Sequence, residues 1–449
     1  MAGLLALPLA ILLGASAGEA GQAAPRSSRL RVAVLSFAGM GGPAGLGDAL
    51  GQVLRDGMRQ VRGLESVKSG ALMESAGRLS LSLGSSLSDD ELLRLGRDLR
   101  LRGLVTGTYT AEGGSLKVQA RLADLGGPGR VVRAEETAGT LAGFVALQAR
   151  VLREVLSRLA VRPTEYDDRR IQAVLGEPTG SLEAYILYGR GAWHLELGSK
   201  EGQEEAVRLL TRATEADENF PLARVALGAS LLATNNRWKG SQEVRKALQI
   251  NPNLAESHRM LAEMLASSPR RPYDLTIQAY LKTAELAPDW AEVWVGLGDA
   301  YQAKGRFDEA VLNYQKALAL EPNNARVHYG MGKIYYNEKQ LYHEAVAEYQ
   351  RAIALDPGLL EAHLSLADLY GEKGLYQEAI ARYDYVLSLD ARHPGATYGL
   401  AMAYEEVDRN KAIVAWERYI ELASTLASEK EWVDIAKKHL AKLRREKSR

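Results

Sequence analysis

Three groups of residues in this chain have the types and spacing from which protein chemistry is built. The first is the glycine-rich run GMGGPA at 39–44, which matches the pattern G-x-G-x-x-A between an expected strand and an expected helix. Backbone N–H groups in such a loop can hold a diphosphate. The usual companions are missing, since Glu65 comes before the end of the next expected strand and no Gly-Lys-Ser/Thr follows the run. We therefore predict a plain connection, with nucleotide binding as the alternative.

Histidine forms the second group, and seven residues of this type suggest a metal site. His258, His328 and His363 occupy equivalent positions in an internal repeat that is described below. Stacked repeats are separated by about 10 Å or more, whereas the ligands of one zinc ion lie about 2 Å from it. The three side chains are therefore predicted to be packing residues, and no metal site is expected.

Paired carboxylates form the third group, with Glu405 and Glu406 as the example. Adjacent residues on a helix point about 100° apart, so such a pair does not converge on one reacting atom. The chain has no cysteine, which excludes disulfides, thiolate metal ligands and a cysteine nucleophile. Because no nucleophile, base and orienting group come together, the sequence predicts a protein that is not an enzyme and needs no cofactor.

The charge balance argues against one further class of partner. The 449 residues include 56 lysines and arginines and 56 aspartates and glutamates, so no overall field attracts nucleic acid or an acidic membrane. A hydrophobic fraction of 46% and a charged fraction of 25% are ordinary for a folded chain of two or three domains. We therefore expect a protein or peptide partner and no nucleic acid.

The segment 291–324 is the unit from which most of the chain is built. Trp294, Leu297, Gly298 and Tyr301 fall on one face of a helix, because their spacing follows a period of about 3.6 residues. A second helix carries the same kind of stripe at Phe307, Ala310, Tyr314 and Ala317. The glycine of the intervening Lys-Gly-Arg turn and the proline at the end of the unit are typical helix terminators. The segment therefore predicts one helical hairpin.

Imperfect copies of this hairpin follow one another along the chain. Spacings of 34, 35 and 34 residues separate Tyr301, Tyr335, Tyr370 and Tyr404. Spacings of 36, 34 and 35 residues separate Pro252, Pro288, Pro322 and Pro357. The unit resembles the tetratricopeptide repeat family, with its pattern of Trp, Leu-Gly, Tyr, Ala, aromatic, Ala and Pro over 34 residues. Such hairpins bury their apolar stripes only against neighbours, so the resemblance implies an all-α solenoid.

Seven hairpins and a terminal helix account for the carboxyl-terminal part. The hairpins are expected within 182–424, at about 182–219, 221–254, 255–290, 291–324, 325–359, 360–393 and 394–424. Residues 428–446 predict a single helix with a polar outer face, which is what the exposed end of a solenoid requires.

An α/β domain is expected over residues 29–161. The apolar run at 31–37 predicts a strand covered on both faces, and 115–124 predicts a strand with one buried face. The order of strands and helices resembles the TolB amino-terminal-like or FlgO-like family, which often precedes tetratricopeptide repeats in bacteria. Residues 162–181 are predicted to be a linker with one helical turn near 169–174.

The amino-terminal segment predicts export. Residues 4–13 are apolar, and Ala15-Ser16-Ala17 is a plausible signal-peptidase site, so 1–24 is interpreted as a signal peptide. The expected location is therefore the bacterial periplasm or the outside of the cell. The alternative is a retained membrane anchor, although the apolar run is shorter than the roughly 20 residues that span a bilayer.

The resemblance also implies where a partner binds. In the tetratricopeptide family the first helix of each hairpin lines a concave groove, whose floor takes the second, fifth, ninth and twelfth residues of each repeat. In the hairpin at 291–324 these are Glu292, Val295, Asp299 and Gln302. The predicted partner-binding residues are Arg326, Tyr329, Lys333, Tyr336, Glu361, Asp368, Tyr398 and Glu405. Tyrosine suits peptide recognition, and the acidic residues predict a partner segment with basic residues. The alternative is a solvated surface that binds nothing.

The leading hypothesis is therefore a non-enzymatic scaffold that brings bacterial cell-envelope proteins together through this groove. A second hypothesis is a sensory or regulatory protein, in which the α/β domain binds a small ligand or nucleotide through the 39–47 loop and signals through the repeats.

Overall fold

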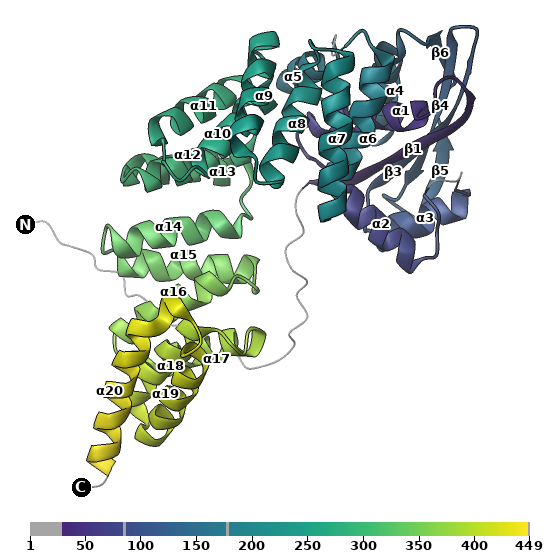
Figure 1. Cartoon of the computed structure of the whole chain (residues 1–449). Helices are drawn as coiled ribbons and strands as arrows, with labels where there is room; N and C mark the ends of the chain where they lie inside the picture. The colour runs from purple at the N-terminus through teal and green to yellow at the C-terminus, as the bar shows by residue number, and fades with distance from the viewer. Residues whose placement is uncertain (1–28, 84–86, 177–178, 448–449) are drawn as a thin grey trace, which may run out of the picture.

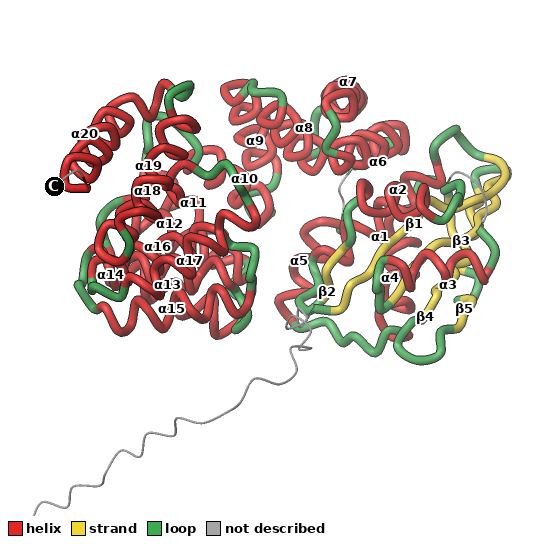
Figure 2. The backbone as a smooth tube through the Cα atoms, turned by 90° about the horizontal axis from the view of Figure 1, so that it is seen from below, coloured by secondary structure: helices red, strands yellow, loops and turns green. Residues whose placement is uncertain are grey.

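The chain folds into an α/β domain followed by a helical solenoid (Figure 1). In the computed structural model, the described residues are 29–83, 87–176 and 179–447. The domain lies at one end of the solenoid, and the last helix lies at the other end (Figures 1 and 2). This arrangement confirms the predicted fold class. The expected signal peptide lies outside the described residues.

A mixed sheet forms the centre of the amino-terminal domain. Its strands are β1 (Leu30–Gly41), β2 (Leu64–Ser66), β3 (Gly103–Glu112), β4 (Ser115–Asp124), β5 (Arg130–Arg133) and β6 (Thr137–Thr140). The order is β2-β1-β3-β4-β5, and β6 also pairs with β4. Strand β1 runs parallel to β2 and β3, whereas β3, β4, β5 and β6 are joined by antiparallel pairings. Strands β5 and β6 pair with opposite halves of β4.

Helices cover both faces of this sheet. They are α1 (Leu46–Arg59), α2 (Ser69–Arg78), α3 (Asp89–Asp98) and α4 (Phe144–Arg158). Val32 and Val34 of β1 pack with residues of α1 and α4, whereas Ala33 and Leu35 pack with residues of α2 and α3. The unbroken apolar run at 31–37 is explained by this burial on both sides. Helix α3 begins at the capping box of Ser88 and Glu91.

The segment between the two parts differs from the expected linker. Residues 165–175 form a helix of 11 residues, α5 (Glu165–Leu175), which begins at a capping box of Thr164 and Asp167. Asp167, Arg170 and Val174 are buried in α5. The prediction of a linker with one helical turn near 169–174 was wrong, because Thr164 and Asp167 begin a longer helix and its charged residues contact other parts of the protein.

The solenoid contains seven antiparallel hairpins within the part of the chain that the structure describes. In order, hairpins 1–7 are α6 (Leu182–Leu197) with α7 (Lys200–Ala216), α8 (Pro221–Ala233) with α9 (Arg237–Ile250), α10 (Ala255–Ala266) with α11 (Tyr273–Leu286), α12 (Ala291–Ala303) with α13 (Phe307–Leu320), α14 (Ala325–Asn337) with α15 (Tyr342–Leu355), α16 (Leu360–Glu372) with α17 (Tyr376–Leu389), and α18 (Pro394–Val407) with α19 (Arg409–Ala423). After the short turn η1 (Ala427–Glu429), helix α20 (Lys430–Lys447) covers the end. Its Val433, Ala436, Leu440 and Leu443 are buried in one cluster with residues of α19.

Small residues let the two helices of a hairpin approach closely. A methyl group built on Gly298 of α12 would lie 2.4 Å from the ring of Tyr314 on α13, and one on Gly332 would lie 2.6 Å from the ring of Tyr349. Both tyrosines are fully buried. At these glycines the two helices of a hairpin approach closely, so the size of one side chain limits the spacing between the helices.

No helix among residues 29–83, 87–176 and 179–447 is long and apolar enough to cross a membrane.

The glycine contact generates a matched stability test. We expect Gly298→Ala to lower the free energy of unfolding by about 1–3 kcal/mol, because its methyl group overlaps the Tyr314 ring. Gly371→Ala is the control, since a methyl group there meets nothing within 4 Å, and alanine favours a helix by about 0.5–1 kcal/mol over glycine. Chemical denaturation followed by circular dichroism measures both. Equal effects of the two substitutions would contradict the packing role.

Candidate binding groove

The inner helices of the hairpins present a row of equivalent side chains, which we call the groove floor. It is defined by the second, fifth and ninth positions of each repeat, which in α12 are Glu292, Val295 and Asp299. In α6 the equivalent residues are Tyr185, Tyr188 and Ala192, because Gly191 corresponds to Gly298. Floor residues of α6, α8 and α10 line a cavity of about 250 Å³ together with residues of α1 and α5. Floor residues of α10, α12 and α14 line a larger cavity of about 640 Å³. The floor is therefore divided into an occupied part and an open part.

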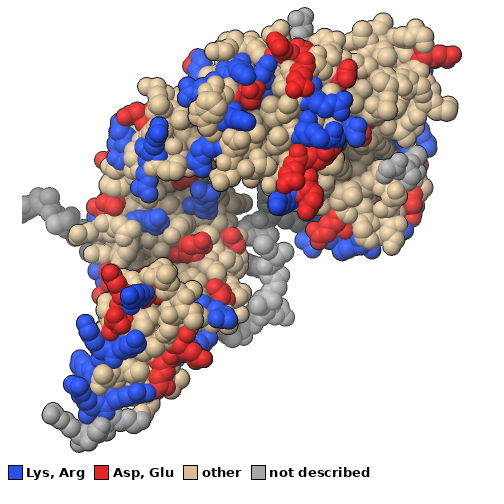
Figure 3. Space-filling view, in the orientation of Figure 1, with Lys and Arg blue, Asp and Glu red and all other residues tan. Residues whose placement is uncertain are grey.

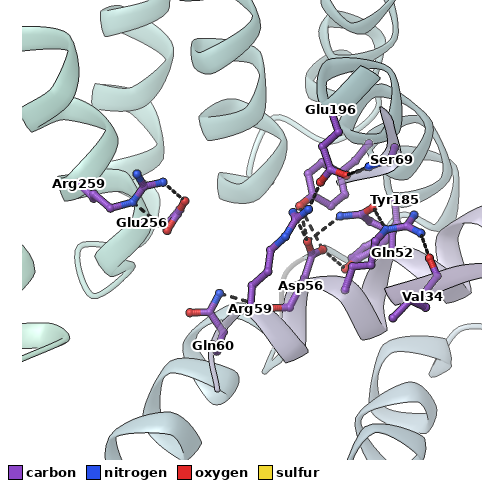
Figure 4. A network of polar contacts seen from close by, with 12 residues as sticks. Val34, Gln52, Asp56, Arg59, Gln60, Ser69, Tyr185, Glu196, Glu256 and Arg259 are labelled. Atoms are coloured by element: carbon purple, nitrogen blue, oxygen red, sulfur yellow. Dashed lines mark hydrogen bonds and ion pairs between the residues drawn. The ribbon is translucent and has the colours of Figure 1, made fainter. Parts of the chain in front are cut away.

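The occupied part begins with a buried carboxylate of the α/β domain. Asp56 of α1 is only 4% exposed and accepts hydrogen bonds from Tyr185 Oη at 3.1 Å, Tyr188 Oη at 3.0 Å and Gln52 Nε2 at 2.7 Å. Both tyrosines are floor residues of α6. Figure 4 shows Asp56 between Gln52 and Tyr185, with Arg59 beside it. Hairpin 1 thus binds helix α1 of its own chain in the groove.

Charged groups at the interface between α1 and α6 favour this particular contact. Burial raises the pKa of Asp56 above its ordinary value, because a charged carboxylate loses its hydration there. The nearest guanidinium atom of Arg59 lies 3.9 Å from Asp56, and Arg59 also forms an ion pair with Glu196 of α6. Ser69 Oγ donates to Glu196 at 2.8 Å. The interface between domain and solenoid is therefore polar at its centre, and its buried groups are matched to one another.

Apolar floor residues of hairpin 2 complete the occupied part. Leu222 and Val225 of α8 are buried, and they line the same cavity as Val174 of α5. The carbonyl of Ala173 accepts from Asn251 Nδ2 at 3.3 Å, which attaches α5 to the turn before α10. Helices α1 and α5 together cover the floor of the first two hairpins.

An arginine attaches α5 to the fourth hairpin. Arg170 is 4% exposed and forms ion pairs with Asp167 of its own helix and with Asp289 before α12. Its guanidinium also lies 5.4 Å from the ring centroid of Trp290 and donates to the carbonyl of Gln60 at 2.8 Å. A single side chain therefore connects α1, α5 and the start of α12.

The open part begins at the 640 Å³ cavity. Glu292, Val295 and Asp299, which were expected on the floor, all line it, together with Arg326 of the next hairpin. Asp299 accepts a hydrogen bond from Tyr314 Oη at 2.6 Å and forms an ion pair with Arg326 at 3.1 Å. The side chain of Arg326 remains 75% exposed. This part of the floor is therefore accessible and charged.

Hairpin 5 supplies four of the predicted partner-binding residues. Arg326, Tyr329, Lys333 and Tyr336 all lie on α14. Lys333 Nζ lies 5.6 Å from the ring centroid of Tyr329, whose ring packs against Tyr349 at 6.0 Å. The pKa of Tyr336 is raised by desolvation and by its hydrogen bond to Glu372 of α16. The two tyrosines are half-buried and present only part of each ring to solvent.

Hairpin 6 carries the acidic residues Glu361 and Asp368. Both are exposed on α16, and Tyr383 Oη donates to Asp368 Oδ1 at 2.5 Å. Desolvation raises the pKa of Asp368, and the charge of Glu372 adds to the shift. Within the described part of the chain, no cation forms an ion pair with Asp368.

The remaining two predicted residues lie beneath the terminal helix. The Tyr398 ring packs against Trp416 at 5.0 Å, Tyr419 at 5.3 Å and Trp432 of α20 at 5.5 Å. Glu405 accepts from Trp416 Nε1 at 2.7 Å, and His439 Nδ1 of α20 lies 2.8 Å from the same oxygen. Tyr398 and Glu405 thus hold the cap in place, a role that the repeat pattern alone does not distinguish from partner binding.

The equivalent histidines make contacts within the solenoid. His258 Nε2 lies 2.9 Å from the carbonyl of Pro252, and His363 Nε2 lies 3.1 Å from that of Pro357. Trp294 Nε1 donates to the carbonyl of Pro288 at 2.7 Å in the same way. His328 instead contacts Glu348 at 2.5 Å. No group of three metal-ligating side chains is present among the described residues, and the rings of His258 and His363 connect their hairpins to the preceding turns.

The glycine-rich run is accounted for by close packing of the backbone. A methyl group on Gly41, which has a φ of 79°, would lie 1.9 Å from the carbonyl oxygen of Ala111 on β3. Asp48, in the first turn of the following helix α1, accepts from Ser36 Oγ at 2.6 Å. A carboxylate in that position repels a phosphate. The geometry of this loop therefore gives no support to the nucleotide alternative.

Sequence reasoning missed the occupied part of the groove. Its signal was present, because the floor residues of hairpins 1 and 2 are tyrosine and aliphatic, namely Tyr185, Tyr188, Leu222 and Val225. Those of hairpins 4 to 6 are mostly charged. A contiguous apolar surface of this kind indicates that another segment or a partner packs on it.

Family models match the central and carboxyl-terminal hairpins. A model described as TPR repeat matches residues 298–339 and 336–374, and one described as Tetratricopeptide repeat matches 364–421. Residues 298–421 are tetratricopeptide repeats. These matched repeats form a protein-interaction scaffold of the tetratricopeptide type. The resemblance of the amino-terminal domain to the TolB amino-terminal-like family lies outside these matches and stays a prediction.

Two curated relatives are human proteins. Tetratricopeptide repeat protein 6 from Homo sapiens is 24% identical over 162 residues, which are 35% of this chain and 30% of that protein. Protein O-mannosyl-transferase TMTC1 from Homo sapiens is 27% identical over 148 residues, which are 32% of this chain and 16% of that protein. The chain thus matches less than a third of either relative, and the activity named for the second is not carried over.

Several solved structures are also similar to this chain. Pseudomonas aeruginosa pilF is 22% identical, with 48% of this chain and 97% of that chain covered and a TM-score of 0.42. MamA is 22% identical, with 35% and 91% covered and a TM-score of 0.33. YrrB, described as a TPR protein with an unusual peptide-binding site, is 17% identical, with 42% and 95% covered and a TM-score of 0.35.

The contacts of α5 generate a second matched test. We expect Arg170→Ala to lower the free energy of unfolding by about 3–5 kcal/mol, because Asp167 and Asp289 would be left buried without a cation. Arg169→Ala is the control, since that side chain is 66% exposed, and its loss costs at most about 0.5 kcal/mol. Urea denaturation of the full chain measures the difference. A small effect of Arg170→Ala would show that α5 is not held against the solenoid.

Proposed function

We propose that this protein is a non-enzymatic scaffold of the bacterial cell envelope whose open groove, formed by hairpins 4–6, binds a partner's peptide segment containing basic residues. The observation that carries the proposal is the unpaired acidic group on α16. Asp368 and Glu361 are exposed there without an ion pair among the described residues, and the pKa of Asp368 is raised by desolvation and, to a smaller extent, by the charge of Glu372. A lysine or arginine of a partner would relieve that repulsion.

The half-buried tyrosines of α14 supply the apolar part of such a site. Tyr329 and Tyr336 are each packed on one side, so their rings are already ordered before a partner binds. An ordered ring contributes apolar contact area at little further cost in conformational entropy. Acidic groups on one helix and aromatic rings on the next are the elements that a basic peptide segment requires.

The α/β domain has a different part in this proposal. Helices α1 and α5 cover the floor of hairpins 1 and 2, so they set where the open groove begins. The expected signal peptide at residues 1–24 supports export of the whole chain. Signal cleavage is checked by the amino-terminal sequence of the protein secreted by a bacterial host.

The substitution Asp368→Asn is expected to raise the stability of the protein while it weakens the binding of a basic partner. A carboxyl whose pKa is raised by folding favours the folded state only while protonated, so its stabilising effect is lost as the pH rises through that pKa. We therefore expect Asp368→Asn to raise the thermal midpoint at pH 7, with the difference disappearing as the pH falls through the pKa of Asp368. The asparagine carbonyl can still accept from Tyr383. A lower midpoint at pH 7 would contradict this sign.

Peptide selection tests the function itself. The full chain is immobilised and used to select from a random peptide library displayed on phage, beside the variant Glu361→Lys/Asp368→Asn. We expect the wild type to enrich peptides with basic residues and the variant to bind them at least about tenfold more weakly. The control is Glu378→Lys, which makes a similar charge change on the outer helix α17. Selection that is unchanged by the groove variant, or equally reduced by the control, would remove the basis of the proposal.

A further inference from the structure

The charges on the open floor alternate in sign from one hairpin to the next. Hairpin 4 presents Glu292 and Asp299, and hairpin 6 presents Glu361 and Asp368. Between them, hairpin 5 presents only cations at the second and ninth positions, Arg326 and Lys333. Neighbouring inner helices are separated by about 10 Å, so the floor is a series of three bands rather than one acidic surface. We call them the first acidic band, the basic band and the second acidic band.

The chain itself already places a basic residue on the first acidic band. Arg29, which precedes β1, donates to Glu292 Oε1 at 3.0 Å and forms a second ion pair with Glu321. Arg326 reaches back to Asp299. The first acidic band is therefore largely neutralised within the molecule, and an arginine is the side chain that it accepts.

In the described part of the chain, Lys333 of the basic band and the second acidic band are not neutralised in this way. Among the described residues, Lys333 forms no ion pair and instead lies over the ring of Tyr329. Glu361 and Asp368 of the second acidic band also lack a cationic partner, as stated above. Among the described residues no ion pair joins Lys333 to Glu361 or Asp368, whereas Arg326 on the same helix does pair with Asp299 of the preceding inner helix.

We infer that the partner segment carries an acidic residue over Lys333 and a basic residue over Glu361 and Asp368, so that a mixed-charge segment is selected rather than a purely basic one. This inference rests on the proposed function and specifies it. A lysine-rich peptide would place a positive charge on the basic band, and like charges in contact disfavour the wrong partner.

The spacing between the two charges of the partner follows from the fold. A separation of about 10 Å corresponds to about three residues in an extended chain, at about 3.3 Å per residue. It corresponds to about seven residues in a helix, at about 1.5 Å per residue. An acidic and a basic residue of the partner at either spacing can pair with the basic band and the second acidic band, whichever direction the segment runs.

The experiment compares the peptides selected by the full-length wild type and by Lys333→Glu from the same random phage library. The wild type is expected to enrich peptides with one acidic and one basic residue at one of these spacings. Lys333→Glu is expected to enrich peptides with two basic residues at the same spacing, and to bind the wild-type peptides at least about tenfold more weakly. Lys200→Glu, at the exposed start of the outer helix α7, is the control and is expected to select the wild-type peptides.

The outcomes separate this inference from the function on which it rests. Enrichment of purely basic peptides by the wild type, with no change in Lys333→Glu, would overturn the mixed-charge inference and leave the basic-segment proposal intact. If the wild type enriches no peptide more strongly than the variant Glu361→Lys/Asp368→Asn does, both the mixed-charge inference and the basic-segment proposal would be overturned. If the peptides selected by Lys200→Glu differ from those of the wild type as much as the peptides selected by Lys333→Glu do, the inference would also be overturned. The effect would then come from net charge alone.

Discussion

The structure depends on the need to cover the apolar floor of the first two hairpins. A solenoid buries its apolar stripes between neighbouring hairpins, but it leaves the inner face of each inner helix without a neighbour. In hairpins 4 to 6 that face is charged and can remain in water. In hairpins 1 and 2 it carries Tyr185, Tyr188, Leu222 and Val225, and helices α1 and α5 remove it from water. The α/β domain is therefore a structural requirement of the repeats as well as a neighbour in sequence.

This constraint explains why the contact between the two parts contains buried charge. Asp56 and Arg170 are both nearly inaccessible, and each is matched to groups on the solenoid, Asp56 to two tyrosine hydroxyls and Arg170 to Asp289. Buried polar groups of this kind cost free energy unless each partner is present, so they favour one docking geometry over others. The position of α1 and α5 in turn determines that the accessible groove starts near α12, where Arg29 is already bound to Glu292.

The accessible part of the groove is short. The family matches cover residues 298–421, which include hairpins 5, 6 and 7. Hairpin 7 is engaged by the terminal helix through Tyr398 and Glu405, so it contributes less accessible surface than its repeat pattern suggests. The open floor between α12 and α16, with its alternating bands of charge, is the part in which we propose that the specificity of this scaffold is concentrated.

The local pattern of the sequence determined much of this architecture. Helical stripes at 291–324, the recurring tyrosines and prolines, and the buried strand at 31–37 depend on short-range periodicity, and the hairpins and β1 occur where that periodicity placed them. The same is true of Gly298, because a small residue at a fixed place in a repeat implies a close approach.

Only the tertiary structure decided which surfaces remain accessible. Residues 162–181 are rich in charge and proline and were expected to be a linker, yet α5 is buried because Arg170 meets Asp289, which is 119 residues away in the chain. Tyr398 and Tyr329 occupy equivalent positions in the repeat, but the first lies under α20 and the second faces the open groove. Periodicity specifies the face of a helix on which a side chain lies. Whether another segment covers that face depends on contacts between distant residues, which no local pattern contains.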